Sequence, residues 1–201
     1  MFIGKYNKSV IVTYLSAVFC VIGICLSVTN HFHLSICCLI LSGICDLFDG
    51  KIARMCKNRT EEDKKFGIQI DSLTDICAFV IFPVVISASM GMNMWYHAII
   101  YALYVLGGII RLAYFNIVAE DGPIKYYSGL PVTSASIIFP LFYLITLFVK
   151  DLIYIIFPLV FLLTGFLFIF NFKIKKPKKN SWTIFCCILA IIGIICILLF
   201  R

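Results

Sequence analysis

The hydrophobic positions of this chain form long runs, and short polar or basic stretches separate them. Each run reaches about twenty residues, the length that a helix needs to cross the hydrocarbon core of a bilayer. Pro140 and Pro158 interrupt the fifth and sixth runs, where a kinked or re-entrant segment is the alternative. We expect seven spans, over Ser9–Val28, Leu34–Ala53, Gly67–Met90, Met94–Val118, Leu130–Val149, Leu152–Phe172 and Trp182–Phe200.

The composition agrees with a membrane protein. Hydrophobic residues make up 62% of the chain and charged residues only 13%, whereas a soluble domain has about 25% charged residues. We therefore predict an all-α, polytopic integral membrane bundle, with residues 1–201 forming a single transmembrane domain. The net charge of +7 lies in short loops, which suits membrane lipid head groups and phosphate-bearing substrates, and no feature indicates nucleic acid.

The basic residues also predict an orientation. Only Lys150 and Arg201 fall on one side of the predicted topology, so fifteen of the seventeen Lys and Arg residues lie in or beside the alternate connections. Positively charged loops face the cytoplasm. We therefore expect a protein of the cell membrane whose N-terminus, residues 46–75 and the Lys125 loop face the cytoplasm.

Four aspartates lie inside the second and third predicted spans. Asp46 and Asp49 come near the end of one span, and Asp71 and Asp75 begin the next. An acidic side chain within a spanning helix is costly and usually marks a functional site. Helical spacing gives each pair a common face, so the four carboxylates converge if the two helices pack side by side.

Clustered carboxylates cannot all stay ionised in a low-dielectric site without a cation. Hard oxygen ligands select Mg²⁺ or Mn²⁺, and four carboxylates suffice for two ions that would clamp a diphosphate. Arg54 would add a charge-assisted hydrogen bond to a phosphate oxygen. Gly50, Ala53 and Gly67 carry little or no side chain, which would let a ligand or the partner helix approach the backbone.

Plainer explanations exist for parts of this pattern. Small residues at helical spacing also serve helix packing, and the charged connector Met55–Phe66 reads as a solvated loop. Acidic residues in spans also occur in cation or proton transporters, which we keep as an alternative function. That alternative would require acids on other helices, whereas the six remaining acidic residues fall in predicted loops.

The complete pattern, D-x-x-D-G-x-x-A-R followed by G-x-x-x-D-x-x-x-D, resembles the signature of the CDP-alcohol phosphatidyltransferase family. Every fixed position is present: Asp46, Asp49, Gly50, Ala53, Arg54, Gly67, Asp71 and Asp75. The resemblance implies a six-helix core plus about one extra helix, commonly dimeric, so we expect a homodimer. Twelve residues separate Arg54 from Gly67, more than the family usually has, and we expect them to enlarge a loop over the nucleotide.

The resemblance also implies the reaction and the roles of the aspartates. Family members are metal-dependent transferases that move a phosphatidyl or phospho-alcohol group from a CDP-linked lipid to a hydroxyl and release CMP. By resemblance, Asp46, Asp49 and Asp71 hold one ion, and Asp46, Asp71 and Asp75 hold or approach the second. Asp75 is the expected general base.

The nucleotide side of the site is implied in the same way. Gly50 and Arg54 would contact the diphosphate of the CDP-lipid. Ala53 and Gly67 belong to the same expected binding surface, and Thr60 is a further candidate nucleotide contact in the connector.

The acceptor is suggested by three further stretches, residues 66–75, 108–116 and 127–131, which are similar to the phosphatidylserine synthase branch of the family. The implied reaction is phospholipid biosynthesis, with CDP-diacylglycerol and L-serine giving phosphatidylserine. Arg111 would bind the serine carboxylate and the Asn116 carbonyl its ammonium. Arg111 neutralising the aspartates is an alternative, as is a sister enzyme that uses glycerol 3-phosphate or an inositol phosphate.

Overall fold

A computed structural model describes residues 3–7, 9–56, 59–120, 126–149, 152–175 and 181–199. The described chain is almost entirely helical. The long helices are α1 (Ile11–Val28), α2 (Phe32–Met55), α3 (Glu61–Asp75), α4 (Phe82–Ser89), α5 (Trp95–Glu120), α6 (Ala135–Phe148), α7 (Ile153–Ile169) and α8 (Ser181–Leu199). A π-helix, η1 (Ile76–Ile81), joins α3 to α4, and a 3₁₀ turn, η2 (Val132–Ser134), precedes α6. Two short strands, β1 (Tyr126–Ser128) and β2 (Lys173–Lys175), pair antiparallel.

The helices match the predicted membrane bundle. Four of the described helical segments are long and apolar enough to cross a membrane: α1, α2, the continuous α3–η1–α4 segment and residues 95–118 of α5. Shorter apolar helices occupy the remaining three predicted spans. Pro140 lies inside α6 and Pro158 inside α7, and both helices continue past their prolines. The protein is therefore an integral membrane helical bundle, as expected.

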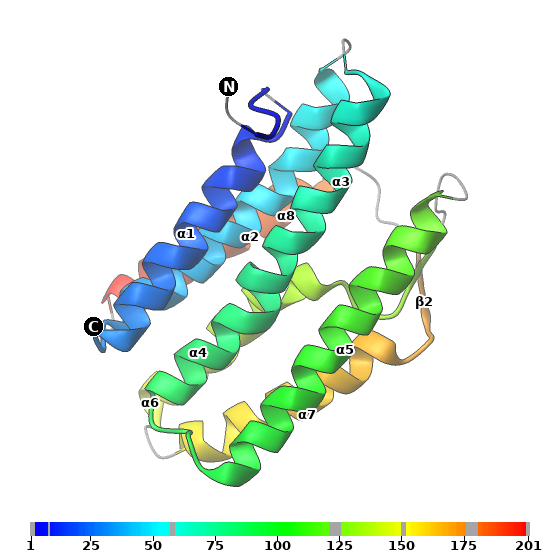
Figure 1. Ribbon diagram of the computed structural model, residues 1–201. Coiled ribbons are helices and arrows are strands. Elements are labelled where there is room, and N and C mark those ends of the chain that lie inside the picture. The colour runs from blue at the N-terminus through cyan, green and yellow to red at the C-terminus, as the bar shows by residue number, and fades with distance from the viewer. Residues whose placement is uncertain are drawn as a thin grey trace.

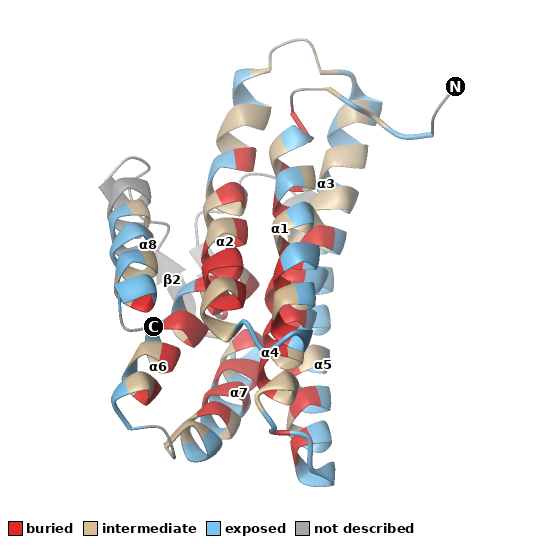
Figure 2. Cartoon of the chain, turned by 90° about the vertical axis from the view of Figure 1, so that its left-hand side faces the viewer, coloured by how far each residue is buried: buried red, intermediate tan, exposed pale blue. Residues whose placement is uncertain are grey.

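Figure 1 shows how the helices are arranged. Helices α1, α2 and α3–α4 lie side by side, α5 pairs with α7, and α8 packs against α2 and α6. The N-terminal segment, the α2–α3 connection and the end of α5 lie at the same end of the bundle. Buried residues follow the faces where the helices meet, whereas exposed ones cover the outside (Figure 2). Many of the exposed side chains are large and apolar, as a surface in contact with lipid requires.

The connector between α2 and α3 differs from the prediction. A charged loop over Met55–Phe66 was predicted, and this was wrong, because α3 already begins at Glu61. Thr60 caps the helix: its hydroxyl accepts a hydrogen bond from the Asp63 amide at 3.1 Å, while the Asp63 carboxylate accepts one from the Thr60 amide at 3.0 Å. This capping box and the acidic first turn stabilise a helix start. The additional residues therefore lengthen a helix instead of enlarging a loop.

The π-helical segment η1 begins directly after Asp75. The segment ends two residues before Pro83, which has no N–H to donate to the carbonyl of Phe79 and whose ring crowds that carbonyl. The wider π-helix is a usual accommodation of such a local mismatch. The hydroxyl of Tyr104 on α5 donates a hydrogen bond of 2.6 Å to the Phe79 carbonyl. Tyr104 thus supplies the donor that Pro83 lacks.

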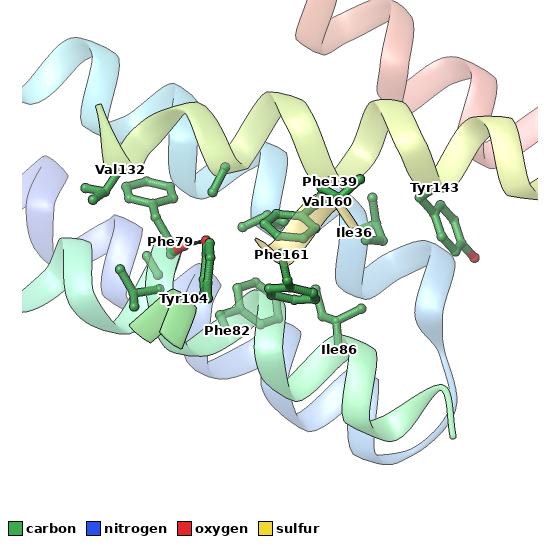
Figure 3. Close-up of a cluster of buried hydrophobic side chains, with 14 of the residues drawn as sticks. Ile36, Phe79, Phe82, Ile86, Tyr104, Val132, Phe139, Tyr143, Val160 and Phe161 are labelled. Carbon is green, nitrogen blue, oxygen red and sulfur yellow. Dashed lines mark hydrogen bonds between the residues drawn. The ribbon is translucent and has the colours of Figure 1, made fainter. Parts of the chain in front are cut away.

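Tyr104 also lies at the centre of the aromatic core (Figure 3). It is fully buried, and its ring lies 5.8 Å from that of Phe139, 4.9 Å from that of Phe161 and 5.3 Å from that of Phe168, measured between centroids. These edge-to-face and tilted contacts join α5, α6 and α7. The core therefore fixes η1, and with it the end of α3, against three other helices.

Small residues allow α5 and α7 to approach closely. A Cβ atom placed on Gly107 would lie 2.7 Å from the carbonyl oxygen of Gly165, and one on Gly165 would lie 2.9 Å from the Cα of Tyr104. Close backbone approach through small residues is the usual way in which membrane helices pack. Gly107 and Gly165 therefore set the separation of the two helices that hold the Tyr104 ring.

We predict that Tyr104→Phe destabilises the folded protein by about 1–3 kcal/mol, because it leaves the buried Phe79 carbonyl without a donor. Thermal unfolding of the purified protein in detergent measures the loss. Tyr114→Phe is the matched control, because Tyr114 lies on the same helix with 53% of its surface exposed. Equal melting temperatures for the two variants would exclude the role of the Tyr104 hydroxyl.

Candidate metal and substrate site

Three carboxylates from α2 and α3 meet between the two helices. Single carboxylate oxygens of Asp46, Asp49 and Asp71 all lie within 4.8 Å of one another. Asp49 is buried, and Asp46 and Asp71 are half-buried. Asp46 and Asp49 are three residues apart on one face of α2, and Asp71 reaches them from α3, as the helical spacing predicts. Their separation is compatible with one cation bound by all three.

Asp75 lies one helical turn further along α3 and is only 8% exposed. Its carboxyl group interacts directly with that of Asp46, and the carboxyl group of Asp49 interacts in the same way with that of Asp71. The four groups thus form one connected cluster that extends from the half-exposed Asp71 to the buried Asp75. Asp75 is the member most removed from solvent on α3.

The donor chemistry of this cluster fits a divalent cation. Within the described parts of the chain, no lysine or arginine forms an ion pair with any of the four carboxylates. Adjacent carboxylates repel one another unless protons or a cation neutralise them. Hard oxygen ligands are those that Mg²⁺ and Mn²⁺ prefer. The cluster is therefore a suitable site for such an ion.

Helix α1 contributes a residue that sequence reasoning missed. The hydroxyl of Thr13 donates a hydrogen bond of 3.3 Å to Oδ2 of Asp49, and both side chains are buried. Thr13 lies between Ser9 and Ser16, which are buried too. This polar stripe at helical spacing in an apolar helix was a usable signal for a helix face directed at the aspartates. Thr13 leaves the second oxygen of Asp49 available for a ligand.

The small motif residues lie on the same helix faces as the aspartates. Gly50 follows Asp49 directly, and a Cβ atom placed on it would lie 3.6 Å from Nη1 of Arg54. The Arg54 side chain is exposed and extends along α2 beside Gly50. An exposed guanidinium in this place is accessible to a phosphate group.

A second arginine, Arg59, was not among the predicted site residues. Its Nη1 donates to the carbonyl of Ala53 at 3.4 Å, and its Nη2 would lie 2.9 Å from a Cβ atom on Gly67. Arg59 therefore lies between the two small motif residues on α2 and α3. Sequence reasoning missed it because the connector was read as a solvated loop.

The first turn of α3 also binds the N-terminal segment. Lys5 donates to Oε2 of Glu62 at 3.0 Å, which raises the pKa of the lysine above its usual range. The hydroxyl of Tyr14 on α1 donates to the Lys5 carbonyl at 2.8 Å. The exposed ion pair contributes little to stability.

In this region Thr60 acts as the helix cap, and its nucleotide contact stays a prediction.

The two predicted acceptor residues lie on α5. Asn116 is held against α3, because its Nδ2 donates to Oγ of Ser72 at 2.9 Å, beside Asp71 in sequence. Arg111 is only 6% exposed. Its Nε donates to the carbonyl of Leu130 at 3.3 Å, and its guanidinium lies over the ring of Phe115. Asn116 thus contacts the turn of α3 that carries Asp71, whereas Arg111 is anchored to the backbone that precedes η2.

Backbone pairing fixes that segment. Strand β1 pairs with β2, the Gly129 amide donates to the Phe172 carbonyl at 2.9 Å, and the Leu130 amide donates to the Leu167 carbonyl at 3.0 Å. Gly129 has φ +75°, and a Cβ atom there would lie 2.7 Å from the Phe168 carbonyl oxygen. Only glycine fits this turn without strain. The turn positions the carbonyl that Arg111 contacts.

Comparison with known proteins agrees with this geometry. The model of the CDP-alcohol phosphatidyltransferase family matches residues 7–166, which include α1 to α6 and most of α7. Helix α8 lies beyond the match, in agreement with a six-helix core and one additional helix.

Three relatives carry names from one branch. A CDP-diacylglycerol–serine O-phosphatidyltransferase of Helicobacter pylori is 31% identical over 159 residues, covering 77% of this chain and 65% of that protein. One from Saccharomyces cerevisiae is 35% identical over 101 residues, covering 46% and 35%. An archaetidylserine synthase of Methanothermobacter thermautotrophicus is 31% identical over 124 residues, covering 61% and 52%. The chain thus matches between about a third and two thirds of the length of these relatives, and it belongs to the CDP-alcohol phosphatidyltransferase family.

Proposed function

We propose that this protein transfers the phosphatidyl group of CDP-diacylglycerol to the hydroxyl of L-serine, giving phosphatidylserine and CMP. The observation that carries the proposal is the cluster of Asp46, Asp49, Asp71 and Asp75 at the contact of two membrane helices. Such a cluster suits a reaction of a diphosphate at the membrane, and the names of the relatives supply the acceptor.

The reaction balances as a substitution at phosphorus. The serine oxygen forms a bond to the phosphorus that carries diacylglycerol, and the bond from that phosphorus to the bridging oxygen breaks. The electron pair leaves with CMP, and the proton of the serine hydroxyl passes to Asp75, which acts as general base. The burial of Asp75 beside Asp46 supports this assignment, because burial favours the protonated form and so makes the carboxylate a stronger base.

The aspartates would hold the cofactor. Asp46, Asp49 and Asp71 would bind one Mg²⁺ or Mn²⁺, and Asp46, Asp71 and Asp75 would hold or approach a second. The bound cations would neutralise the diphosphate and the leaving phosphate. Gly50, Ala53 and Gly67 would belong to the nucleotide surface, with the Arg59 guanidinium lying beside Gly67, and Arg54 and Thr60 would provide polar contacts.

The serine would bind between α3 and α5. The Oδ1 atom of Asn116 accepts a hydrogen bond from Ser72 at 3.2 Å, and a carbonyl oxygen can accept a second one, here from the serine ammonium. Arg111 would bind the serine carboxylate. The Ser72 contact holds Asn116 against α3, one residue from Asp71 in sequence, which supports an acceptor site on this side of the carboxylates.

We further propose that the site opens to the cytoplasm and that the protein is a homodimer. The α2–α3 connection lies at the end of the bundle that carries the N-terminus (Figure 1). Most basic residues lie in or beside the connections predicted on that side, and positively charged loops face the cytoplasm. The dimer follows from the family resemblance.

The decisive experiment is an assay of the purified protein with CDP-diacylglycerol and radiolabelled serine. We expect labelled phosphatidylserine and CMP in equal amounts, loss of both on chelation of divalent cations, and recovery with Mg²⁺ or Mn²⁺. CMP release with glycerol 3-phosphate or an inositol phosphate in place of serine would instead identify a sister enzyme. Absence of CMP release with every acceptor would favour the transporter alternative.

Asp75→Asn should abolish turnover while binding of CDP-diacylglycerol stays largely intact, because the amide cannot accept the serine proton. Single-turnover CMP release and equilibrium binding of the CDP-lipid measure the two effects. Glu62→Gln serves as the control, since that exposed carboxylate lies outside the cluster. Full activity of Asp75→Asn would exclude Asp75 as the base.

Arg111→Ala should raise the KM for serine by about tenfold or more, while the KM for CDP-diacylglycerol changes little. The reason is the loss of the charge-assisted contact with the serine carboxylate. Arg111→Lys keeps the charge but not the planar fork, so an intermediate KM is expected. A parallel rise of both KM values would show that Arg111 acts on the structure of the site and does not contact serine.

A further inference from the structure

Arg59 joins the end of α2 to the start of α3. Its Nη1 donates to the carbonyl of Ala53 at 3.4 Å, and its Nη2 donates to the carbonyl of Asp63 at 3.5 Å. Both distances exceed the usual range for N–H···O hydrogen bonds, so the two contacts are weak. Main-chain oxygens therefore hold the guanidinium in place only weakly.

The Asp63 carboxylate lies close enough to interact electrostatically with Arg59, but among the described residues it forms no ion pair with it. The Nε of Arg59 is buried and has no hydrogen-bond partner among the described residues, where no other carboxylate forms an ion pair with the guanidinium either. A buried donor without a partner costs free energy, and more so when it belongs to a charged group. An anion that reaches this guanidinium would therefore gain an uncommonly favourable contact.

The position of Arg59 relates directly to the carboxylate cluster. Ala53 follows Asp49 by four residues on α2, and Gly67 precedes Asp71 by four residues on α3. The guanidinium contacts both of these small residues, so it lies about one helical turn, or roughly 5.4 Å along the axis, beyond Asp49 and Asp71. The guanidinium lies on the side of the carboxylates that is nearer the α2–α3 connection.

We propose that Arg59 binds the phosphate of the CMP half of the CDP-lipid, an inference that rests on the proposed function. The acyl chains must extend into the bilayer, so the nucleotide half faces the end of the bundle where α2 and α3 are connected. A group one turn beyond the carboxylates on that side meets the phosphate that leaves with CMP. The planar guanidinium offers several donors to phosphate oxygens at once.

A purely structural function is the competing explanation, since Arg59 also ties α2 to α3. The two explanations differ in what they predict for CMP and for cytidine, which lacks the phosphate. A phosphate contact affects only CMP. A structural brace affects both ligands, because it would displace Gly67 and the whole nucleotide surface.

The test is calorimetric binding of CMP and of cytidine to the full-length protein in detergent with Mg²⁺. We expect the wild type to prefer CMP, and Arg59→Gln to lose about tenfold in CMP affinity with unchanged cytidine affinity. Lys64→Gln is the matched control: it removes one positive charge from the adjacent first turn of α3, where Lys64 pairs with Glu61 at 2.6 Å, and it should leave both affinities unchanged.

The possible results distinguish failure of the phosphate contact from failure of the proposed function. Equal loss for both ligands, or unchanged CMP affinity in Arg59→Gln, overturns the phosphate contact while the proposed function stands. A wild type that binds neither ligand overturns both. If Arg59→Gln does not fold, Arg59→Lys decides, because an ammonium cannot make the two-pronged contact: a reduced preference for CMP over cytidine supports the proposal, and an unchanged preference overturns it.

Discussion

Packing α2 beside α3 brings the carboxylate oxygens of Asp46, Asp49 and Asp71 within 4.8 Å of one another, and like charges at this separation repel strongly where the dielectric constant is low. The surrounding helices must therefore hold α2 and α3 together. Helix α1 does so on one side, because it contacts both α2 and α3 and forms a 2.6 Å hydrogen bond with α2 between the hydroxyls of Ser16 and Ser42. A cation at the cluster would remove the repulsion, so binding of the cofactor and cohesion of the bundle are thermodynamically linked.

The rigid aromatic core and the polar carboxylate cluster lie in different parts of the bundle. The aromatic core around Tyr104 joins α5, α6 and α7 and fixes η1, whereas the polar groups gather toward the end where α2 and α3 are connected. Side chains from α1, α2, α3 and α5 reach that region, with Thr13, Ser72 and Asn116 linking the helices by hydrogen bonds. The aromatic core therefore forms a rigid base on which the carboxylate cluster stands.

The sequence alone was sufficient for the bundle and for the aspartate cluster, because both follow from local rules. Apolar runs have the length of a span, and residues four apart share a helix face. The start of α3 was predictable too, since Thr60 and Asp63 have the spacing of a capping box, but the charge of the connector was taken as the mark of a loop. The contacts of Thr13 with Asp49 and of Tyr104 with Phe79 depend on which helices meet, and no local pattern contains that information.

The relation between Pro83 and Tyr104 has a consequence for how this sequence can change over time. The Tyr104 hydroxyl is needed only because residue 83 has no N–H for the Phe79 carbonyl. Any other residue at position 83 would restore the donor within the helix and make the hydroxyl dispensable. The order of substitution therefore matters. Loss of the Tyr104 hydroxyl is tolerated once Pro83 has been replaced, but it destabilises a protein that still has the proline. Two positions on different helices, neither of them a predicted ligand, are thus expected to evolve as a pair.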